Sequence, residues 1–344
     1  MNEGGGHAEL NFICPACRVT VTHEVCAYTC QSCGRVYPVL FGIPDFRIRP
    51  DRYLSISDER GKASRLYNFG QTASFERLVD YYYSITDDVP PELAKSFARY
   101  VRDAPVRADG ALKALGGTDT GGKLLDVGCG SGGALLAAKH HFAVIIGVDI
   151  GMRWLVIAQK RLTEGGGRAI LVCADIEALP FADEGFDRVI ADDVIEHAYS
   201  PLAATTAVAR QVAPGGKLLI SAINRNWIGP HPAVGLWAAG LMPARLRSRI
   251  IFRMRGIDAL RNMGFVSPSA VIRAGRRAGV GVEMARARAF GAQAVAGRSP
   301  GFRRLAVIYA WFGSSPVLRN IIFWVGPTFE IVFRRQVESK GDYL

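Results

Sequence analysis

The chain has 344 residues, of which 49% are hydrophobic and 21% are charged. This balance indicates a globular protein and excludes a disordered one, and the length suffices for a full-size core with an accessory module. No apolar run approaches the roughly 18 residues that span a bilayer, so we expect no transmembrane segment. The first ten residues show no signal-peptide pattern, which favours a cytoplasmic protein with reduced cysteines.

The net charge of +11 is distributed unevenly along the chain. Residues 218–339 hold 18 arginines, no lysine and four acids, which gives this segment a net charge of +14 and leaves the rest slightly acidic. An electrostatic partner would therefore meet the C-terminal third. Anionic lipid and nucleic acid are the usual partners of such a surface.

Four of the seven cysteines form two C-x2-C pairs near the start of the chain. The pairs are Cys14 with Cys17 and Cys30 with Cys33. They supply four thiolates for tetrahedral zinc, and so short a segment cannot otherwise bury a core. Cys26 is an alternative ligand to Cys30, although the C-x2-C spacing favours Cys30. We therefore predict a zinc ribbon over residues 1–45; the alternative is a metal-free remnant.

The middle of the chain changes from a helical pattern to an alternating one. Residues 46–118 are polar and helical, and DDVPPELAKSFARYV has a helix start with proline just inside. In residues 119–224 the apolar runs KLLDVGC, AVIIGVDI, AILVCADI, FDRVIADD and GKLLISAI alternate with helical segments. Strands that alternate with helices predict a parallel, doubly wound sheet, so the fold class is α/β and Rossmann-like.

The C-terminal part follows a looser pattern. Residues 225–280 are predicted to form a basic, amphipathic cap insertion of helical character. Within residues 281–344, VGVEMARARAF and PTFEIVFRRQ are predicted to be the last two strands, and an apolar insertion lies between them. The predicted fold is thus a doubly wound core with a small ribbon before it and a helical cap after it.

The run LLDVGCGSGG joins the first predicted strand to a glycine-rich loop. Acidic residues then stand at the ends of the second and third predicted strands. Asp149 ends the second strand, where a carboxylate can accept from two ribose hydroxyls. Asp175 ends the third strand, where it can accept from an adenine amino group. Ile150 and Ile176 follow these acids and are expected to sandwich the adenine ring.

This set of residues resembles the class I AdoMet-dependent methyltransferases, specifically the branch that includes the ubiquinone-biosynthesis methyltransferases. The typical D-x-G-C-G-x-G run is matched by Asp126, Gly128, Cys129, Gly130 and Gly132. VAPGGKLLIS resembles the family's run into the fifth strand, and the likeness covers roughly residues 120–224. The alternative core is a nicotinamide dehydrogenase, which would not explain the acid after the third strand.

The resemblance implies AdoMet as cofactor and a glycine loop that faces its methionyl group. It also implies that Asp149 binds the ribose and Asp175 the adenine. We assign Asp192, at the end of the fourth strand, to the same cofactor site.

The stretch ADDVIEHAYSP follows the fourth strand, whose end faces the crevice where open α/β sheets bind ligands. We predict a catalytic set of His197, Glu196 and Asp193, with His197 as general base. In the ubiquinone O-methyltransferases, an acid three residues before this Glu, the Glu and the His can bind a divalent cation. Asp193 stands where those proteins usually carry Glu. The alternative is a capping box, in which these acids only begin a helix.

Aromatic residues and arginines interleave in residues 227–325. The aromatic residues are Trp227, Trp237, Trp311, Phe312, Phe323 and Trp324. Ile250, Met254, Ile257 and Leu260 recur at helical spacing. This pattern suits a peripheral surface on anionic lipid, or a stripe that faces the protein's own core.

The first functional hypothesis is an enzyme (EC 2.1.1.-) that methylates a hydroxyl, or as a second choice a carbon, of a lipophilic or aromatic small molecule. The second hypothesis is a methyltransferase acting on rRNA or tRNA bases, because a zinc ribbon before this fold resembles the ribosomal-RNA guanine methyltransferases and the surface is basic. The third is a partner-dependent scaffold that docks through its ribbon.

Overall fold

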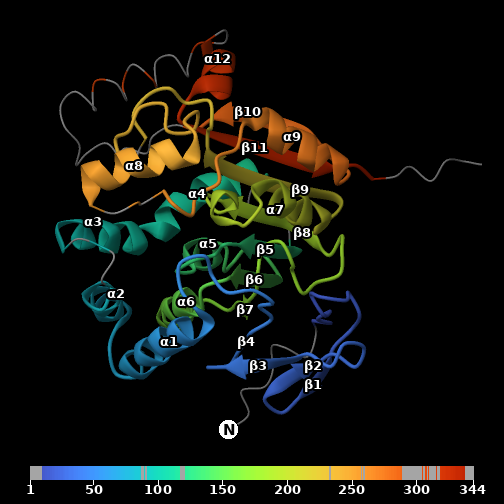
Figure 1. Ribbon diagram of the computed structural model, residues 1–344. Helices are drawn as coiled ribbons and strands as arrows, with labels where there is room; N and C mark the ends of the chain where they lie inside the picture. Colours follow the sequence, from blue (N-terminus) through green and yellow to red (C-terminus); the bar gives the residue numbers. More distant parts are fainter. Residues whose placement is uncertain are drawn as a thin grey trace, which may run out of the picture.

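The computed structural model describes residues 10–86, 89, 91–116, 121–231, 234–256, 258, 260–288, 304, 307, 309, 315 and 318–337. The N-terminal module is a small antiparallel sheet in the order β1-β2-β3-β4. Its strands are β1 (Thr22–Glu24), β2 (Ala27–Thr29), β3 (Val36–Leu40) and β4 (Ile43–Pro44). This ribbon lies beside one edge of the large sheet, below β7 in Figure 1.

Four helices connect the ribbon to the large sheet. They are α1 (Ile56–Gly70), α2 (Phe75–Ser84), α3 (Pro91–Arg102) and α4 (Ala104–Ala114). Ser55 and Ser74 cap α1 and α2 by accepting from backbone N–H groups three residues on. Pro91 is the first residue of α3, as its sequence pattern predicts.

Residues 45–54, which we call the strap, contain no helix, so the helical prediction is wrong for the start of this segment. Buried ion pairs hold the strap in place of helical hydrogen bonds. Arg47 pairs with Asp45 at 2.7 Å, and Asp51 pairs with Arg153 at 3.1 Å.

The large sheet has seven strands in the order β10-β11-β9-β8-β5-β6-β7. The strands are β5 (Lys123–Val127), β6 (Val144–Asp149), β7 (Ile170–Cys173), β8 (Phe186–Asp192), β9 (Val212–Ile223), β10 (Val280–Ala287) and β11 (Thr328–Arg335). Strands β5 to β9 pair with one another in parallel, and β11 runs antiparallel between β9 and β10. The doubly wound core and the two last strands are therefore confirmed.

Alternate residues of each buried strand pack into hydrophobic cores on opposite faces of the sheet. Leu124 and Ile145 pack on the face covered by α5 (Gly133–Ala137), α6 (Met152–Gly165) and α4. Leu125 and Ile146 pack on the face covered by α7 (Pro201–Arg210) and α9 (Pro268–Arg277). The strand order reverses between β5 and its neighbours β6 and β8, and in open α/β sheets the ligand crevice lies at such a point.

Aromatic residues attach the ribbon to the sheet. The ring of Phe12 packs against those of Tyr28, Phe46 and Phe181, with ring centroids 5.0 to 5.9 Å apart. The backbone N–H of Phe46 donates to the carbonyl of Cys173 at 2.7 Å, which extends the sheet edge beyond β7. The ribbon core is therefore continuous with the sheet core.

The cap contains α8 (Ala244–Arg255), and the apolar insertion ends in α12 (Leu318–Val325). Gly256, with φ of 72°, ends α8, so the predicted stripe does not continue along one helix to Leu260. Leu260 is buried with Ile251 in a small separate core, Ile250 packs against that core, and Met254 is exposed. Ile257, Trp311 and Phe312 lie outside the described residues.

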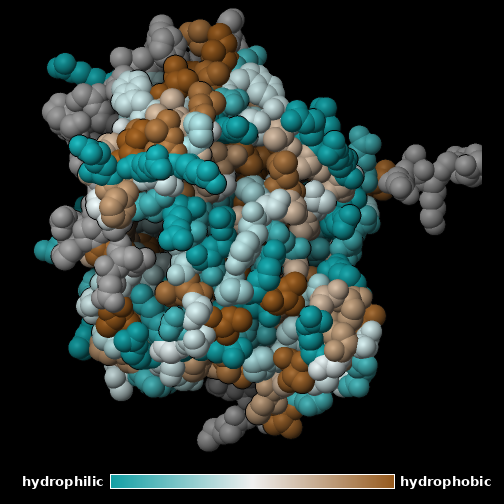
Figure 2. Space-filling view, viewed as in Figure 1, coloured by the Kyte–Doolittle hydropathy of each residue, from teal (hydrophilic) through white to brown (hydrophobic). Residues whose placement is uncertain are grey.

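Apolar and basic side chains share the surface of this end of the molecule. Figure 2 shows hydrophobic residues over α12 and beside α8, next to a hydrophilic row along α8. Trp237 and Phe252 are each more than 60% exposed. Within the described part of the chain, no helix combines the length and hydropathy needed to cross a bilayer.

Candidate cofactor and active site

A cavity of about 610 Å³ lies at the carboxyl ends of β5, β6, β7 and β8. Its volume is within the range of about 300–1,000 Å³ that is common for small-molecule and cofactor sites. The predicted site residues in its wall are Gly128, Gly130, Asp149, Ile150, Asp175, Ile176, Asp193 and His197. The structure thus brings together residues from four strand ends in one cavity.

Two glycines of the glycine-rich loop lie in the wall of this cavity. Gly128 has φ of 77°, and a Cβ there would lie 2.3 Å from the Cγ2 of Val194. Gly130 has φ of 50° and open space around a Cβ position. The loop therefore needs glycine at Gly128 for both conformation and space, and at Gly130 for conformation alone.

Two backbone N–H groups fix the carboxylate of Asp149. Gly130 donates to Oδ2 at 2.9 Å and Gly151 to Oδ1 at 2.7 Å. Burial raises the pKa of Asp149 to about 6, although the two backbone N–H groups favour its charged form. Each oxygen keeps a second lone pair, so the carboxylate can still accept from a ribose diol.

Asp175 is paired with the strap. Arg49 donates to its Oδ2 from Nε at 2.8 Å and also reaches Glu177 at 3.0 Å, while Oδ1 accepts from the backbone N–H of Glu177 at 2.9 Å. The Arg49 guanidinium lies 4.5 Å from the ring centre of Tyr199. The acid that we assign to adenine is therefore paired with an arginine that itself packs on a tyrosine ring.

Three further predicted cofactor residues are not in the cavity wall. Asp126 and Cys129 are 4% and 7% exposed, and Gly132 begins α5 in a left-handed conformation. Burial, followed by Asp192 and Asp149, raises the pKa of Asp126 to about 8. Asp126 is therefore largely a neutral acid at pH 7.

Asp192 and Asp193 form a cluster with Arg288 and Ser221. Arg288 donates to Asp192 at 2.7 Å and to Asp193 at 2.9 Å, and the Ser221 hydroxyl bonds both carboxylates. Asp193 has φ of 52°, and its backbone N–H donates to Ser221 Oγ at 3.0 Å. Asp192 faces this cluster and is absent from the cavity wall, and its assignment to the cofactor site stays a prediction.

The capping alternative is wrong. The short 3₁₀ helix Ile195–His197 has Val194 at its N-cap and no side-chain capping bond. The carboxylate of Asp193 is held by Ser221 and Arg288, and these partners lie far away in the sequence.

The predicted cation set of Asp193, Glu196 and His197 is not assembled either. Glu196 is 2% exposed, its Oε2 has no hydrogen-bond partner, and burial together with Asp193 raises its pKa to about 8. Arg288 already neutralises Asp193. Among the described residues, four cysteines are the one group of three or more His, Cys, Asp or Glu side chains whose ligand atoms all lie within 4.8 Å of one another.

His197 lies in the cavity wall and contacts the strap. The Tyr53 hydroxyl is 2.7 Å from its Nδ1. His197 is exposed at the cavity mouth, and partial desolvation by the surrounding wall lowers its pKa, which favours a neutral ring that can take a proton at pH 7.

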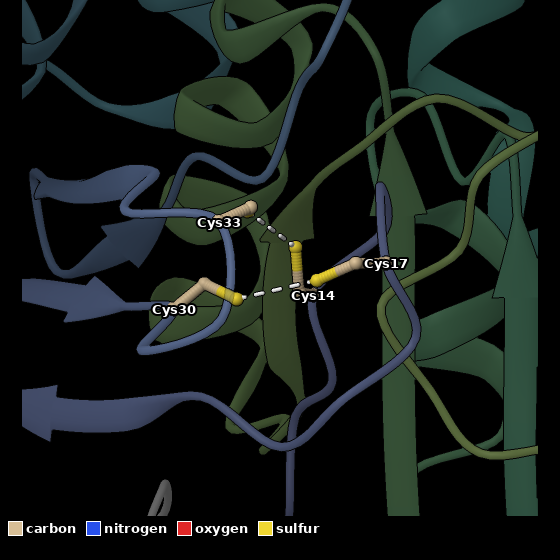
Figure 3. Close-up of side chains that lie close together, drawn as sticks. All are labelled: Cys14, Cys17, Cys30 and Cys33. Carbon is tan, nitrogen blue, oxygen red and sulfur yellow. Dashed lines mark hydrogen bonds between the residues drawn. The ribbon is translucent and has the colours of Figure 1, made fainter.

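The four predicted cysteines converge in the ribbon (Figure 3). The Sγ atoms of Cys14 and Cys33 are 3.7 Å apart, and those of Cys17 and Cys30 are 3.4 Å apart. A zinc tetrathiolate with Zn–S bonds of about 2.3 Å has sulfur–sulfur edges of about 3.8 Å, so the spacing fits this ion. The Tyr37 hydroxyl lies 3.1 Å from Cys14 Sγ, where it can donate to a thiolate.

The strap supplies site residues that the sequence analysis missed. Asp51, Arg52, Tyr53 and Leu54 line the cavity, and Arg47 donates to the carbonyl of Ile150 at 3.2 Å. The alternation of acids and arginines in DFRIRPDRY was a signal of paired charges. Arg288 gave no such signal, because it lies 95 residues from Asp193 in the chain.

Comparison with known proteins places the core in a family. The model of the methyltransferase domain family Methyltransf_11 matches residues 125–220. The ubiquinone biosynthesis O-methyltransferase of Idiomarina loihiensis is 35% identical over 127 residues, which cover 36% of this chain and 49% of that protein. The same enzyme of Pseudomonas fluorescens (strain SBW25) is 38% identical over 110 residues, which cover 31% and 46%.

The chain therefore spans about half the length of the curated relatives it matches. Among solved structures, Haemonchus contortus phosphoethanolamine N-methyltransferase 2, in complex with S-adenosyl-L-methionine, has a TM-score of 0.46 at 16% identity and covers 77% of this chain and 60% of its own. The strand order, the glycine loop and the family match agree with one another. Residues 125–220 are a methyltransferase domain, and its fold is that of the class I methyltransferases.

Proposed function

We propose that the protein is an AdoMet-dependent methyltransferase that acts on a hydroxyl group of a lipophilic or aromatic small molecule. The observation that carries the proposal is the single cavity that joins the glycine loop, two strand-end acids and His197. The names of the curated relatives, ubiquinone biosynthesis O-methyltransferases, support a hydroxyl acceptor.

AdoMet supplies an activated methyl group when bound. Asp149 accepts hydrogen bonds from the ribose hydroxyls, and Asp175 accepts from the adenine amino group. Ile150 and Ile176 pack on the adenine faces. These roles agree with the positions of the four side chains in the cavity wall and with the backbone bonds that preset Asp149.

His197 takes the proton of the acceptor hydroxyl in this proposal. A neutral imidazole in the cavity wall is suited to this role, whereas the buried Glu196 holds its own proton near pH 7. Asp193 and Asp192 position Arg288 and the loop after β8, and they have no proton-transfer role.

We also propose a structural zinc ion held by Cys14, Cys17, Cys30 and Cys33. Their sulfur spacing supports it. The ion would stabilise the ribbon, and the aromatic contacts of the ribbon would then position the strap.

We also propose that the protein binds peripherally to an anionic membrane surface from the cytoplasmic side. Exposed Phe252 and Met254 lie on α8 with Arg249 and Arg253, an arrangement that suits the interface of an anionic bilayer. A lipophilic acceptor would be met there. The basic charge equally keeps RNA as an alternative partner.

Calorimetric titration with AdoMet tests cofactor binding, and we expect micromolar affinity. Transfer of a labelled methyl group to a panel of catechols, phenols, isoprenoid quinols and total RNA tests the acceptor class. We expect transfer to lipophilic phenols or quinols. Absence of AdoMet binding by folded protein would overturn the proposal, and transfer to RNA alone would replace it by the nucleic-acid alternative.

A further inference from the structure

Tyr53 and His197 contact each other in the wall of the cavity. The hydroxyl oxygen of Tyr53 lies 2.7 Å from Nδ1 of His197, and the ring centroids are 6.0 Å apart. The two residues are 144 positions apart, so only the folded strap brings them together. The contact occupies Nδ1 and leaves Nε2 as the second ring nitrogen.

Hydrogen bonds and an ion pair hold the backbone around this contact in place. Arg52 donates to the carbonyl of Ala198 at 2.7 Å, so the residue before Tyr53 is tied to the residue after His197. The carbonyl of Arg52 accepts from Asn262 at 2.7 Å. The backbone N–H of Tyr53 donates to Asp51 at 3.2 Å, and Asp51 is paired with Arg153.

A histidine can act as base through Nε2 only if that nitrogen carries a lone pair, and the bond at Nδ1 decides this. If Nδ1–H donates to the tyrosine oxygen, Nε2 is free to take a proton. If the tyrosine hydroxyl donates to Nδ1, Nε2 carries the hydrogen instead. Tyr53 is 44% exposed, so its own hydroxyl hydrogen can point to water.

We propose that Tyr53 is a positioning residue that accepts a hydrogen bond from Nδ1–H of His197 and keeps Nε2 as the lone pair facing the acceptor. The inference rests on the proposed role of His197 as base. In the reaction, the acceptor hydroxyl proton moves to Nε2 as its oxygen bonds to the methyl carbon. The methyl–sulfur bond breaks with its electrons on sulfur, and both ring nitrogens then carry hydrogen.

Two charged groups of the strap act on His197: Asp51 favours its charged form and Arg52 opposes it. Tyr53 contacts the ring, and Glu196 precedes His197 in the chain. The other titratable or charged groups of the cavity wall are Asp58, Lys62, Arg65, Tyr82, Asp149, Arg153, Asp175, Asp193 and Tyr199. The variant Tyr53→Phe removes the hydroxyl and leaves the ring and these charges. It therefore isolates the hydrogen bond.

The first test reads the tautomer of His197 directly, by ¹⁵N NMR of histidine-labelled protein, with His197→Ala for assignment. We expect hydrogen at Nδ1 in the wild type and a shift towards hydrogen at Nε2 in Tyr53→Phe. Tyr81→Phe, in which the altered ring stacks on Phe69 away from the cavity, should match the wild type. Hydrogen at Nε2 in the wild type would overturn the proposal.

The second test uses methyl transfer. In Tyr53→Phe we expect kcat to fall about 10- to 100-fold, part of the roughly 100- to 10,000-fold that a positioned base contributes, with AdoMet affinity unchanged. In a His197→Ala background, Tyr53→Phe should cause no further loss. A further loss there would reduce Tyr53 to a structural contact.

The two tests separate the two proposals. Absence of AdoMet binding, or of any methyl transfer, removes the proposed function whatever the tautomer. Methyl transfer with the wrong tautomer removes the role of Tyr53 and leaves the function in place.

Discussion

Asp149 is held between two backbone N–H groups, and its pKa is raised by burial to about 6. Its charged form predominates above that pH, and the neutral form predominates below it. Protonation weakens its power to accept from a ribose diol, because hydrogen bonds to charged groups are the stronger ones. The AdoMet site is therefore sensitive to mild acid.

We predict that AdoMet affinity falls as the pH drops through about 6. Asp149→Asn should weaken binding at pH 7.5 by about 1.5–3 kcal/mol, the usual range for a hydrogen bond to a charged group. It should also flatten the pH dependence. Titration calorimetry at several pH values measures both, with Asp109→Asn, at an exposed position outside the cavity wall, as control.

Substitutions in the glycine loop separate the cost of a left-handed backbone from the cost of a steric clash. Gly128→Ala introduces a left-handed alanine and a clash with Val194, whereas Gly130→Ala introduces the conformation alone. Gly166, with φ of 65° and open space, lies away from the cavity and serves as reference. We expect Gly166→Ala and Gly130→Ala to lose about 1–2 kcal/mol of stability each, and Gly128→Ala to lose more.

Thermal unfolding and AdoMet titration of the three variants test this order. Gly128→Ala should also lose AdoMet binding, because the loop must move to relieve the clash. Equal stability of Gly128→Ala and Gly166→Ala would show that Val194 yields without cost.

At the scale of elements, the ribbon and the strap act on the cofactor cavity together. The ribbon holds the strap through Phe12 and Phe46, and the strap meets the ends of β6, β7 and β8 through Arg47, Arg49 and Arg52. Loss of the ribbon would therefore loosen one wall of the cavity.

We predict one zinc ion per chain, measured by elemental analysis. Cys30→Ser should reduce zinc content, lower the melting temperature and weaken AdoMet binding, because metal binding contributes directly to the folding of such modules. Cys26→Ser, at an exposed position outside the cysteine group, should change none of these. Full AdoMet affinity in a zinc-free Cys30→Ser protein would show that the strap holds its place without the ribbon.

The positions of the core strands along the chain follow from the sequence because each buried strand is a short apolar run with turn signals at its ends. Gly128, Asp149 and Asp175 were also predictable, since strand ends of a parallel sheet share one edge. Tyr53 and Arg288 were not predictable. They reach the site through tertiary contacts that leave no local pattern, and the strap is fixed by ion pairs that span more than 100 residues.

The residues after β8 show the same limit of prediction from the sequence. A capping box and a cation site both use acids three residues apart, so spacing alone could not separate them. The structure adds Arg288 and Ser221, which bind the acids and exclude both interpretations. The guanidinium of Arg288, which directly follows β10, therefore distinguishes interpretations that the spacing of the acids alone does not separate.

At the scale of the whole molecule, the ribbon and the arginine-rich cap lie at opposite edges of the sheet (Figure 1). The exposed apolar residues beside α8 and on α12 share the cap end with the arginines (Figure 2). This separation places any lipid contact far from the ribbon.

We predict that the protein floats with phosphatidylglycerol vesicles at low salt and not with phosphatidylcholine vesicles, since anionic lipid attracts the arginines. Phe252→Glu should reduce flotation several-fold. Val25→Glu, at an exposed apolar position in the ribbon, is the matched control. Equal flotation of both variants, or none by the wild type, would contradict a membrane surface at the cap.

The aromatic contact between the ribbon and the sheet also has a consequence for synthesis on the ribosome. Phe12 and Phe46 are made early, and Phe181, the ring partner of Phe12, is made 135 residues after Phe46. At about 5–20 residues per second, these rings wait on the order of ten seconds for that partner. During that interval the nascent ribbon presents an uncovered aromatic face, which a chaperone can bind until the third strand of the core emerges.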